Sequence, residues 1–269
     1  MSRELLAGRL ERLVPIELPE LEATAALLIR RDRKYVVPVW VADRFAGLLA
    51  EGCRVLEVED RRRFHYESVY FDTPQGTSYL GAARRRSRRF KVRTRSYLDT
   101  SRCLLEIKTR DPRGRTVKQR SVHPIEARDR LDPAGRAFVG ACPLVEDHGL
   151  ALAPALVTRY TRATLLLDDP GVRITIDTDV EAETPDGRAV TLPGMAIVET
   201  KSGGPPSPAD RLLWSLGHRP IRISKFCTSL AVLRPELPSN KWTPALRLPW
   251  SLSDLGRPLD CPAARAAIA

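Results

Sequence analysis

Several sequence features that would indicate a particular chemistry are missing from this 269-residue chain. None of its 5 cysteines lies in a Cys-x-x-Cys pair, so we expect neither a disulfide framework nor a zinc site. Its 4 histidines are scattered, and we expect structural or surface roles for them. The chain also has no Gly-x-Ser-x-Gly nucleophile elbow and no Gly-x-x-x-x-Gly-Lys phosphate loop. The familiar serine-hydrolase and phosphate-loop sites are therefore excluded.

Long apolar segments are missing too. No apolar run reaches the length of a membrane span, and Met1 to Leu13 mixes arginine and glutamate with leucine, unlike a signal peptide. Aromatic residues make up 6% of the chain and do not alternate with its basic runs, as stacking platforms for nucleic acid would. We therefore expect a cytoplasmic protein, either free or held at a membrane by a separate partner, that binds no nucleic acid.

Positive charge is what the chain has in excess. Its 44 lysines and arginines outnumber 33 aspartates and glutamates, for a net charge of +11. Composition alone indicates an anionic partner, which is nucleic acid, a membrane surface or a highly phosphorylated molecule or polymer. The densest basic segment, Arg84–Arg89, holds five arginines in six residues. We interpret it either as a solvated loop or as a rim that attracts anions.

In the middle of the chain, the charge follows a strand pattern. Residues 90–97, 102–110 and 115–120 read as three strands separated by turns. Side chains two residues apart in a strand share a face, and this pairs Arg93 with Arg95, Glu106 with Lys108, and Lys118 with Arg120. The alternate positions include Val92, Ile107 and Val117. The charged face is therefore either open to solvent or turned into the lumen of a barrel.

The rest of the chain favours the barrel. We expect further strands over residues 23–39, 53–58, 63–71, 156–167, 172–180 and 195–201. We expect helices over 41–50, over 125–139 with an interruption at Asp132-Pro133, and over 207–216. Many of these strands also carry charge at i and i+2, which a two-layer sheet does not require and a barrel with a polar interior does. We predict an α+β fold, a closed antiparallel β-barrel with a charge-lined interior and helices packed outside.

Cations crowded inside such a barrel are costly unless carboxylates or a bound anion neutralise them. The candidate carboxylates are Asp32, Glu106, Asp177 and Glu199. Each can pair with lysine or arginine, or hold a divalent cation.

Eight short motifs that follow one another between Arg30 and Leu233 resemble a known family. They are Arg31-Asp32-Arg33-Lys34-Tyr35, Ser68-Val69-Tyr70-Phe71-Asp72-Thr73, Lys91-Val92-Arg93-Thr94-Arg95-Ser96-Tyr97, Leu105-Glu106-Ile107-Lys108, Thr158-Arg159-Tyr160, Arg173-Ile174-Thr175-Ile176-Asp177, Val198-Glu199-Thr200-Lys201 and Ser224-Lys225-Phe226. Together they resemble the VTC domain, the polyphosphate polymerase catalytic domain of the triphosphate tunnel metalloenzyme superfamily. The resemblance implies an eight-stranded antiparallel tunnel that binds a nucleoside triphosphate and polyphosphate.

The resemblance also implies an activity and a set of site residues. Members of this kind transfer the terminal phosphoryl group of ATP to a growing polyphosphate chain, assisted by Mn²⁺ or Mg²⁺. By motif, the catalytic cations would be Lys34, Arg93, Arg95, Lys108 and Lys201. Further phosphate-binding cations would be Lys118, Arg120, Arg159, Arg173 and Lys225. The metal ligand would be Glu199, with Glu106 and Asp32 as further candidates, although Asp32 stands where the family usually has glutamate.

Simpler roles stay open for several of these residues. Glu199 and Lys201 could form only an ion pair, Lys34 could be a solvated strand charge, and Glu106 could merely orient Lys108. Two other functions also fit the same cations. One is a metal-dependent triphosphatase, in which water replaces the acceptor phosphate, and the other is a non-catalytic polyphosphate-binding protein. We predict an N-terminal helical segment over residues 1–22, the VTC-like domain over 23–234 and a loosely ordered, proline-rich tail over 235–269.

Overall fold

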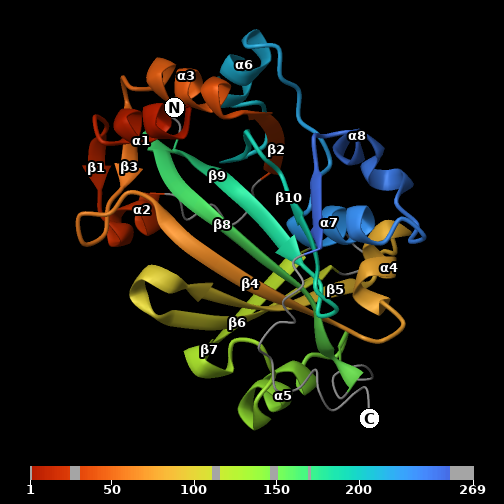
Figure 1. Cartoon of the computed structure of the whole chain (residues 1–269). Helices are drawn as coiled ribbons and strands as arrows, with labels where there is room; N and C mark the ends of the chain where they lie inside the picture. The colour runs from red at the N-terminus through yellow and green to blue at the C-terminus, as the bar shows by residue number, and fades with distance from the viewer. Residues whose placement is uncertain (1, 25–30, 111–115, 146–150, 169–170, 255–269) are drawn as a thin grey trace. The chain divides into compact units, whose positions relative to one another are not determined.

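The computed structural model describes residues 2–24, 31–110, 116–145, 151–168 and 171–254 (Figure 1). The chain divides into two compact units. Unit 1 comprises Met1–Phe64, Tyr160–Val180 and Pro193–Arg222, and unit 2 comprises His65–Arg159, Glu181–Leu192 and Ile223–Ala269. The division passes through the two longest described strands, β8 (Ala153–Leu167) and β9 (Val172–Glu183), so both strands contribute to both units.

Unit 1 holds most of the N-terminal elements. They are α1 (Ser2–Leu10), β1 (Val14–Ile16), α2 (Leu18–Thr24), β2 (Arg31–Pro38), α3 (Val39–Leu48) and β3 (Cys53–Leu56), with the later β11 (Met195–Ser202) and α6 (Pro208–Ser215). The predicted N-terminal helical segment therefore contains two helices separated by a short strand. The strand expected over residues 23–39 is confirmed only for Arg31–Pro38, because its first two residues belong to α2 and residues 25–30 lie outside the described part of the chain. The helix expected over 41–50 is confirmed as α3.

Unit 2 contains the remaining described strands and the helices beside them. Its strands are β4 (Phe64–Asp72), β5 (Arg89–Tyr97), β6 (Arg102–Arg110), β7 (Thr116–His123), β10 (Arg188–Thr191) and β12 (Ser251–Asp254). Its helices are α4 (Thr77–Ala83), α5 (Pro133–Gly140), α7 (Lys225–Leu233) and α8 (Thr243–Leu246). The helix expected over 125–139 is shorter than predicted, because Asp132 caps a new start and Pro133 lies at its first turn.

The strands confirm an α+β fold with an antiparallel sheet, but barrel closure is not confirmed. In the described residues the sheet has 12 strands, ordered β12-β10-β9-β8-β4-β5-β6-β7 along its main path. Every pairing with a described register is antiparallel except that of β1 with β3. Within this described part, β7 pairs only with β6 and β2 only with β11, so the expected eight-stranded ring is not seen.

The sheet branches because its long strands change partners along their length. Residues 173–177 of β9 pair with β11, whereas residues 181–183 pair with β10. Between the two stretches lies Asp179, whose φ of 54° is unusual for a residue with a side chain. A simple alternation of charged and apolar residues predicts strands, but it does not reveal where one strand passes from one partner to the next.

In unit 1, helices cover the apolar face of β2, β9 and β11. The buried residues of α3 are Val39, Val41, Ala42, Phe45 and Ala46, which is helical spacing for one face. They join one core with Tyr35 and Val37 of β2, Val198 of β11, and Leu213 of α6. Because neighbouring residues of a strand point to opposite faces, Lys34, Glu199 and Lys201 lie on the face turned away from these helices.

Unit 2 repeats this arrangement with a separate core. Val69 and Phe71 of β4, Val92 of β5 and Ile107 of β6 pack with Val139 of α5. Arg93 and Glu106 therefore lie on the opposite face. Val117 of β7 does not join this core, since 52% of its surface is exposed.

The C-terminal residues expected to be loosely ordered include several defined elements. Tyr79 donates a hydrogen bond to the Pro238 carbonyl, and Trp242 is buried with its ring centroid 5.7 Å from that of Tyr79. Beyond them, β12 pairs with β10. Residues 255–269 of the predicted tail lie outside the described part of the chain. No helix among the described residues is long and apolar enough to cross a membrane.

Candidate phosphate-binding clusters

The charged face of unit 1 contains a cluster centred on Glu199, hereafter the Glu199 cluster. Glu199 of β11 lies opposite Lys34 of β2 in the strand register. Its Oε2 lies 3.7 Å from Lys34 Nζ, and its Oε1 lies 2.8 Å from Lys201 Nζ. Beside them, Arg162 of β8 forms a bidentate pair with Asp177 of β9, at 2.6 and 2.8 Å. The cations and carboxylates of this cluster thus come from β2, β8, β9 and β11 and form ion pairs on one sheet face.

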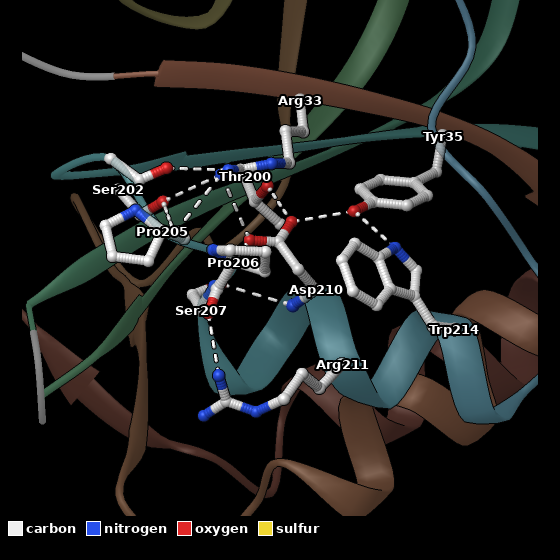
Figure 2. A network of polar contacts seen from close by, with 11 residues as sticks. Arg33, Tyr35, Thr200, Ser202, Pro205, Pro206, Ser207, Asp210, Arg211 and Trp214 are labelled. Carbon is white, nitrogen blue, oxygen red and sulfur yellow. Dashed lines mark hydrogen bonds and ion pairs between the residues drawn. The ribbon is translucent and has the colours of Figure 1, made fainter.

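A polar network behind this cluster holds its strands in place. Asp210 of α6 is fully buried and accepts hydrogen bonds from Tyr35 of β2 at 2.8 Å and from Thr200 of β11 at 2.6 Å (Figure 2). Asp210 also accepts from the backbone N–H and hydroxyl of Ser207, which caps the helix. Tyr35 and Thr200 are sequence neighbours of Lys34, Glu199 and Lys201. The network therefore fixes the backbone on which the Glu199 cluster stands.

Burial shapes the protonation of the Glu199 cluster. Burial raises the pKa of Glu199, but Lys34 and Lys201 outweigh it and hold that pKa well below its usual range. The pKa of Lys201 falls to about 8, because burial and the nearby Arg162 together outweigh the attraction of Glu199. At neutral pH, Glu199 is therefore a carboxylate between two lysines, one of which is close to losing its proton.

The charged face of unit 2 contains a second cluster, centred on Glu106. Glu106 of β6 is directly opposite Arg93 of β5 and Arg120 of β7, on the charged face that the sequence pattern predicted. Its Oε2 accepts from Arg93 Nε at 2.8 Å, and its Oε1 pairs with Lys118 Nζ. Glu106, Arg93, Arg95, Lys118 and Tyr70 are hereafter the Glu106 cluster. Glu106 is almost fully buried, at 3% exposure.

Three cations of the Glu106 cluster shift the pKa values of the groups beside them. Burial raises the pKa of Glu106, but Arg93, Arg95 and Lys118 lower it further than burial raises it. Burial is also the largest effect on Lys118, whose pKa falls to about 8 despite the attraction of Glu106. Among the residues that define it, the cluster thus has three cations for one carboxylate.

Tyr70 of β4 is the aromatic member of the Glu106 cluster. Its hydroxyl accepts a hydrogen bond from Arg93 at 3.1 Å, and its ring stacks on Phe226 of α7 with centroids 4.8 Å apart. Burial raises the pKa of Tyr70, but Arg93, Arg95 and Lys91 bring it down to about 8. Tyr70 therefore both packs on Phe226 and contacts a cation of the Glu106 cluster.

Arg95 has a polar atom with no partner among the described residues. Its Nε is buried and makes no hydrogen bond, while its guanidinium carbon lies 5.6 Å from the centre of the Tyr66 ring. A buried N–H without an acceptor costs free energy, so such a group indicates a missing ligand or water. A phosphate oxygen is the kind of acceptor that an arginine N–H prefers.

Arg159 belongs to a different network in unit 2. It donates to Glu67 at 2.9 Å and to Glu183 at 2.9 Å, and Arg128 donates to the other oxygen of Glu67 at 2.9 Å. Burial lowers the pKa of Arg159, but its hydrogen bonds to these carboxylates outweigh burial and raise it. Arg159 is therefore matched by two carboxylates, Glu67 and Glu183, whereas Arg93 shares the carboxylate of Glu106 with Lys118.

The remaining predicted residues are placed by their strands. In unit 1, Lys201 lies opposite both Asp32 of β2 and Arg173 of β9. In unit 2, Lys108 lies opposite Lys118, and Lys225 begins α7 behind the cap residue Ser224. The structure therefore brings all thirteen predicted site residues to charged strand faces except Arg159, in its own network, and Lys225, on a helix. Their roles in binding or catalysis stay predictions.

The carboxylates of the two clusters are the oxygen ligands that a divalent metal would need. The described residues contain no group of three or more His, Cys, Asp or Glu side chains that could hold one. Glu199 and Glu106 each stand alone between cations, with both oxygens engaged. Mg²⁺ and Mn²⁺ are often bound by one or two carboxylates together with substrate phosphates. These donors therefore fit a metal that arrives with a phosphorylated substrate, and they do not fit a metal bound by protein groups alone.

Sequence reasoning missed two contributors to these clusters. Arg159 was selected from the sequence and Arg162 was not. The two residues are three apart, and this odd spacing places them on opposite faces of β8. Asp177, the bidentate partner of Arg162, had been named only as a carboxylate. Glu67 was also missed, because it precedes the apolar run of β4 and nothing nearby in sequence indicates its two arginine partners. The alternation of faces could have found Arg162, but only the fold brings Glu67 to Arg128 and Arg159.

Comparison with solved structures gives distant likenesses. A putative adenylyl cyclase from Hippeastrum, described as having a dominant triphosphatase activity, is 18% identical over 78% of this chain and 98% of its own, with a TM-score of 0.48. A putative adenylate cyclase from Vibrio parahaemolyticus is 13% identical over 70% and 87%, with a TM-score of 0.42. A Pyrococcus horikoshii protein is 14% identical over 73% and 94%, with a TM-score of 0.42. At these values the likenesses carry no argument about function.

No curated protein matches the chain. A family model does match it, and covers more than half of its length. The VTC domain matches residues 29–234, the span that contains both the Glu199 cluster and the Glu106 cluster. The chain therefore belongs to the VTC domain family.

Proposed function

We propose that this protein transfers the terminal phosphoryl group of ATP to inorganic polyphosphate, with Mn²⁺ or Mg²⁺ as the cofactor. The observation that carries the proposal is the charge imbalance of the Glu106 cluster, in which Arg93, Arg95 and Lys118 face one carboxylate. The orphaned Nε of Arg95 lies in this cluster. Membership of the VTC domain family supports a phosphorylated substrate for it.

Phosphoryl transfer suits a site made of cations. The reaction requires positioning of the reactants and stabilisation of charge on the transferred oxygens, and little covalent chemistry by the protein. Arg93 and Arg95 supply planar guanidinium groups that can bind two phosphate oxygens at once, and Lys118 supplies a point charge. A divalent metal, when bound with substrate at Glu199 or Glu106, would neutralise phosphate charge. A catalytic nucleophile is not needed, in agreement with the motifs that the sequence lacks.

The balance of charge within each cluster supports a defined role for its carboxylate. Glu106 keeps Arg93 and Lys118 oriented while leaving the cluster with net positive charge. Glu199 does the same for Lys34 and Lys201. When a phosphate anion binds, these cations can pair partly with the ligand and partly with the carboxylate. No buried charge is then left without a partner.

The test is a product analysis with the full chain. Purified protein is incubated with ATP and Mn²⁺, and ADP, free phosphate and polyphosphate are separated. We expect ADP together with polymer. Free phosphate without polymer would instead identify a metal-dependent triphosphatase, and binding of polyphosphate without turnover would identify a non-catalytic binder. Either of these two outcomes would overturn the proposed transferase.

A further inference from the structure

The turn that ends α4 consists of three consecutive arginines. Arg84 is the C-cap of the helix, and Arg85 follows it with a φ of 54°, in the left-handed region. The N–H of Arg85 donates to the Ala82 carbonyl at 3.3 Å, and the N–H of Arg86 donates to the Gly81 carbonyl at 2.9 Å. These two bonds form the Schellman motif that closes many helices. Arg84, Arg85 and Arg86 are hereafter the arginine turn.

The backbone position of Arg85 favours glycine. In the left-handed conformation the Cβ of any other residue comes close to a carbonyl oxygen, so glycine is the usual residue after the C-cap in this motif. An arginine here therefore costs conformational free energy that a glycine would not. Strained positions of this kind occur where the side chain serves a function, and the strain itself is what points to one.

The side chains of the arginine turn lie at the surface. All three are exposed, and no carboxylate in the described part of the chain pairs with any of them. The guanidinium of Arg89 donates to the Arg86 carbonyl at 2.5 Å, which holds the turn in place from the start of β5. Three adjacent exposed cations on an ordered turn concentrate positive potential at one place on the surface.

Stabilisation of the helix end does not account for these three side chains. Cations that follow a helix can neutralise its last carbonyls, and this is the ordinary role of a basic residue there. In this helix, Lys241 has that role, because its ammonium donates to the Ala82 carbonyl at 2.8 Å. Among the described residues, no guanidinium of the arginine turn donates to a carbonyl of α4. The turn is therefore available to an outside partner.

Further positive charge lies beside the arginine turn. Burial lowers the pKa of Lys241, and Arg89, Lys91 and Arg85 lower it further. This effect requires the ammonium of Lys241 to lie near the guanidinium of Arg85. An anionic partner that approaches the turn is therefore attracted by more cations than the three that contact it.

The geometry and composition of the turn indicate a broad anionic surface as its partner. Arg84 has φ −80° and ψ 6°, whereas Arg85 is left-handed, so successive side chains leave the backbone in different directions and cover an area. Residues 84–89 are all arginine or serine. They offer no aromatic ring on which a base could stack and no apolar side chain to anchor a protein partner. Lipid phosphates are spread over a plane, and guanidinium groups bind phosphate oxygens in pairs.

We propose that the arginine turn binds the surface of a membrane that contains anionic lipids. Cations close to such a surface are attracted by its negative potential, and each adds to the affinity. None of the three side chains is apolar, so we expect reversible binding that weakens as salt is added. Membrane binding of this kind is independent of the proposed function, because the turn belongs to neither the Glu199 cluster nor the Glu106 cluster.

Vesicle sedimentation with the full chain measures this binding. Vesicles of phosphatidylcholine alone are compared with vesicles that also contain phosphatidylserine, and we expect the wild type to sediment only with the second kind. Arg84→Gln, Arg85→Gln and Arg86→Gln together should lower the partition coefficient by about 100-fold, since each arginine contributes about fivefold. Affinity for tripolyphosphate should be unchanged in this variant.

A matched variant tests whether the position of the charges matters. Arg44→Gln, Arg136→Gln and Arg247→Gln together remove the same charge from three exposed positions, in α3, in α5 and at the end of α8. Charges more than a Debye length from the membrane are screened, so this dispersed variant should bind vesicles like the wild type.

A single substitution keeps the test independent of folding. Arg85→Gly removes one charge and relieves the left-handed backbone, so we expect a higher melting temperature than that of the wild type. Vesicle binding should nevertheless be weaker by about fivefold. Higher stability with weaker binding is the result expected for a side chain retained for its function. A lower melting temperature with unchanged vesicle binding would show that Arg85 is structural, and would overturn the proposal.

Three other results would also overturn it. Equal losses in the turn variant and the dispersed variant would assign vesicle binding to net charge alone. Wild-type protein that binds both kinds of vesicle alike, or neither, would remove the role of anionic lipid. Weaker binding of the turn variant to a single-stranded oligonucleotide or to long-chain polyphosphate, with unchanged binding to vesicles, would identify a polymer as the partner in place of a membrane.

Discussion

The Glu199 cluster of unit 1 and the Glu106 cluster of unit 2 use the same parts in different proportions. Each places one buried carboxylate between cations on neighbouring strands. In unit 1, Arg162 brings its own partner Asp177, so Lys34, Lys201 and Arg162 face two carboxylates. In unit 2, Arg93, Arg95 and Lys118 face Glu106 alone. The carboxylates of unit 1 nearly balance its cations, and those of unit 2 do not.

This difference separates two tasks that charged residues perform on a buried strand face. A balanced cluster can hold its geometry without a ligand, because each charge has a partner. An unbalanced cluster retains positive potential, which attracts an anion and is relieved when the anion binds. We infer that the Glu106 cluster contributes more to phosphate affinity and that the Glu199 cluster is better suited to orient a metal with its substrate.

The most direct test of this difference between the clusters removes two cations from each of them. We expect Arg93→Ala with Arg95→Ala to lower tripolyphosphate affinity by about 100-fold or more, because a charge-assisted hydrogen bond contributes about 1.5 to 3 kcal/mol. The fold should survive, since Glu106 keeps Lys118. Calorimetric affinity and thermal melting check both statements. A collapse in melting with normal affinity in the folded fraction would show that the two arginines are structural.

The matched variant in unit 1 is Lys34→Ala with Lys201→Ala. It leaves Glu199 buried without its two lysines, so we expect a clear loss of thermal stability as well as weaker binding. If this variant melts like the wild type and the unit 2 variant does not, the inferred division between a balanced and an unbalanced cluster is wrong.

A second prediction concerns the support behind the Glu199 cluster. Asp210→Ala removes the buried acceptor for Tyr35, Thr200 and Ser207, and should cost about 3 to 5 kcal/mol of unfolding free energy. Denaturant titration measures it. Asp129→Ala, next to Arg130 on the surface of unit 2, is the control and should cost about 1 kcal/mol or less. Equal losses for the two variants would contradict the structural role given to Asp210.

A third prediction tests which carboxylate serves the metal. Glu199→Gln keeps the size of the side chain and removes its charge, so we expect metal-free triphosphate affinity to be unchanged or higher. Metal-dependent turnover should fall by about 100-fold, since a ligand is lost. Turnover against Mn²⁺ concentration is the measurement, with Glu106→Gln as the matched variant. Wild-type turnover and Mn²⁺ dependence in Glu199→Gln would move the metal site to Glu106 or Asp32.

The smallest expected effect is on pH dependence. Lys118 and Lys201 both have a pKa of about 8 in the folded protein, below the usual 10.5, and only their protonated forms attract phosphate. Affinity for tripolyphosphate should therefore fall as the pH rises through about 8, by up to about tenfold for each lysine. The lowered pKa has the opposite effect on stability. It disfavours the folded state below about pH 8, and this penalty shrinks as the pH rises from about 8 to 10.5.

Conservative variants assign the pH effect to one cluster. Lys118→Arg and Lys201→Arg keep the charge at high pH, and each should remove its own share of the decrease. Tyr70 titrates near the same pH, and its phenolate would repel an anion, so Tyr70→Phe is measured beside them. An affinity that is flat between pH 7 and pH 10 in the wild type would contradict the lowered lysine pKa values.

The sequence by itself determined the strands, their charged faces and the residues that those faces carry. A period of two is a local property, so the pattern around Arg93, Glu106 and Lys118 was enough to place each of them on the charged face of its strand. The N-terminus of α6 could likewise be predicted, because Ser207 and Pro208 are residue types that start helices and they are adjacent in the sequence.

Only the tertiary structure decided which charges are balanced. The arginine partners of Glu67, Asp177 and Asp210 lie 15 to 177 residues away in sequence, and no local pattern brings them together. The sequence also could not show where β9 changes its pairing partner, because the alternation of charged and apolar side chains is the same whichever strand lies alongside. Local periodicity fixes the face of a side chain, whereas the pairing of buried charges depends on strand order and register, which the whole chain selects through its two cores.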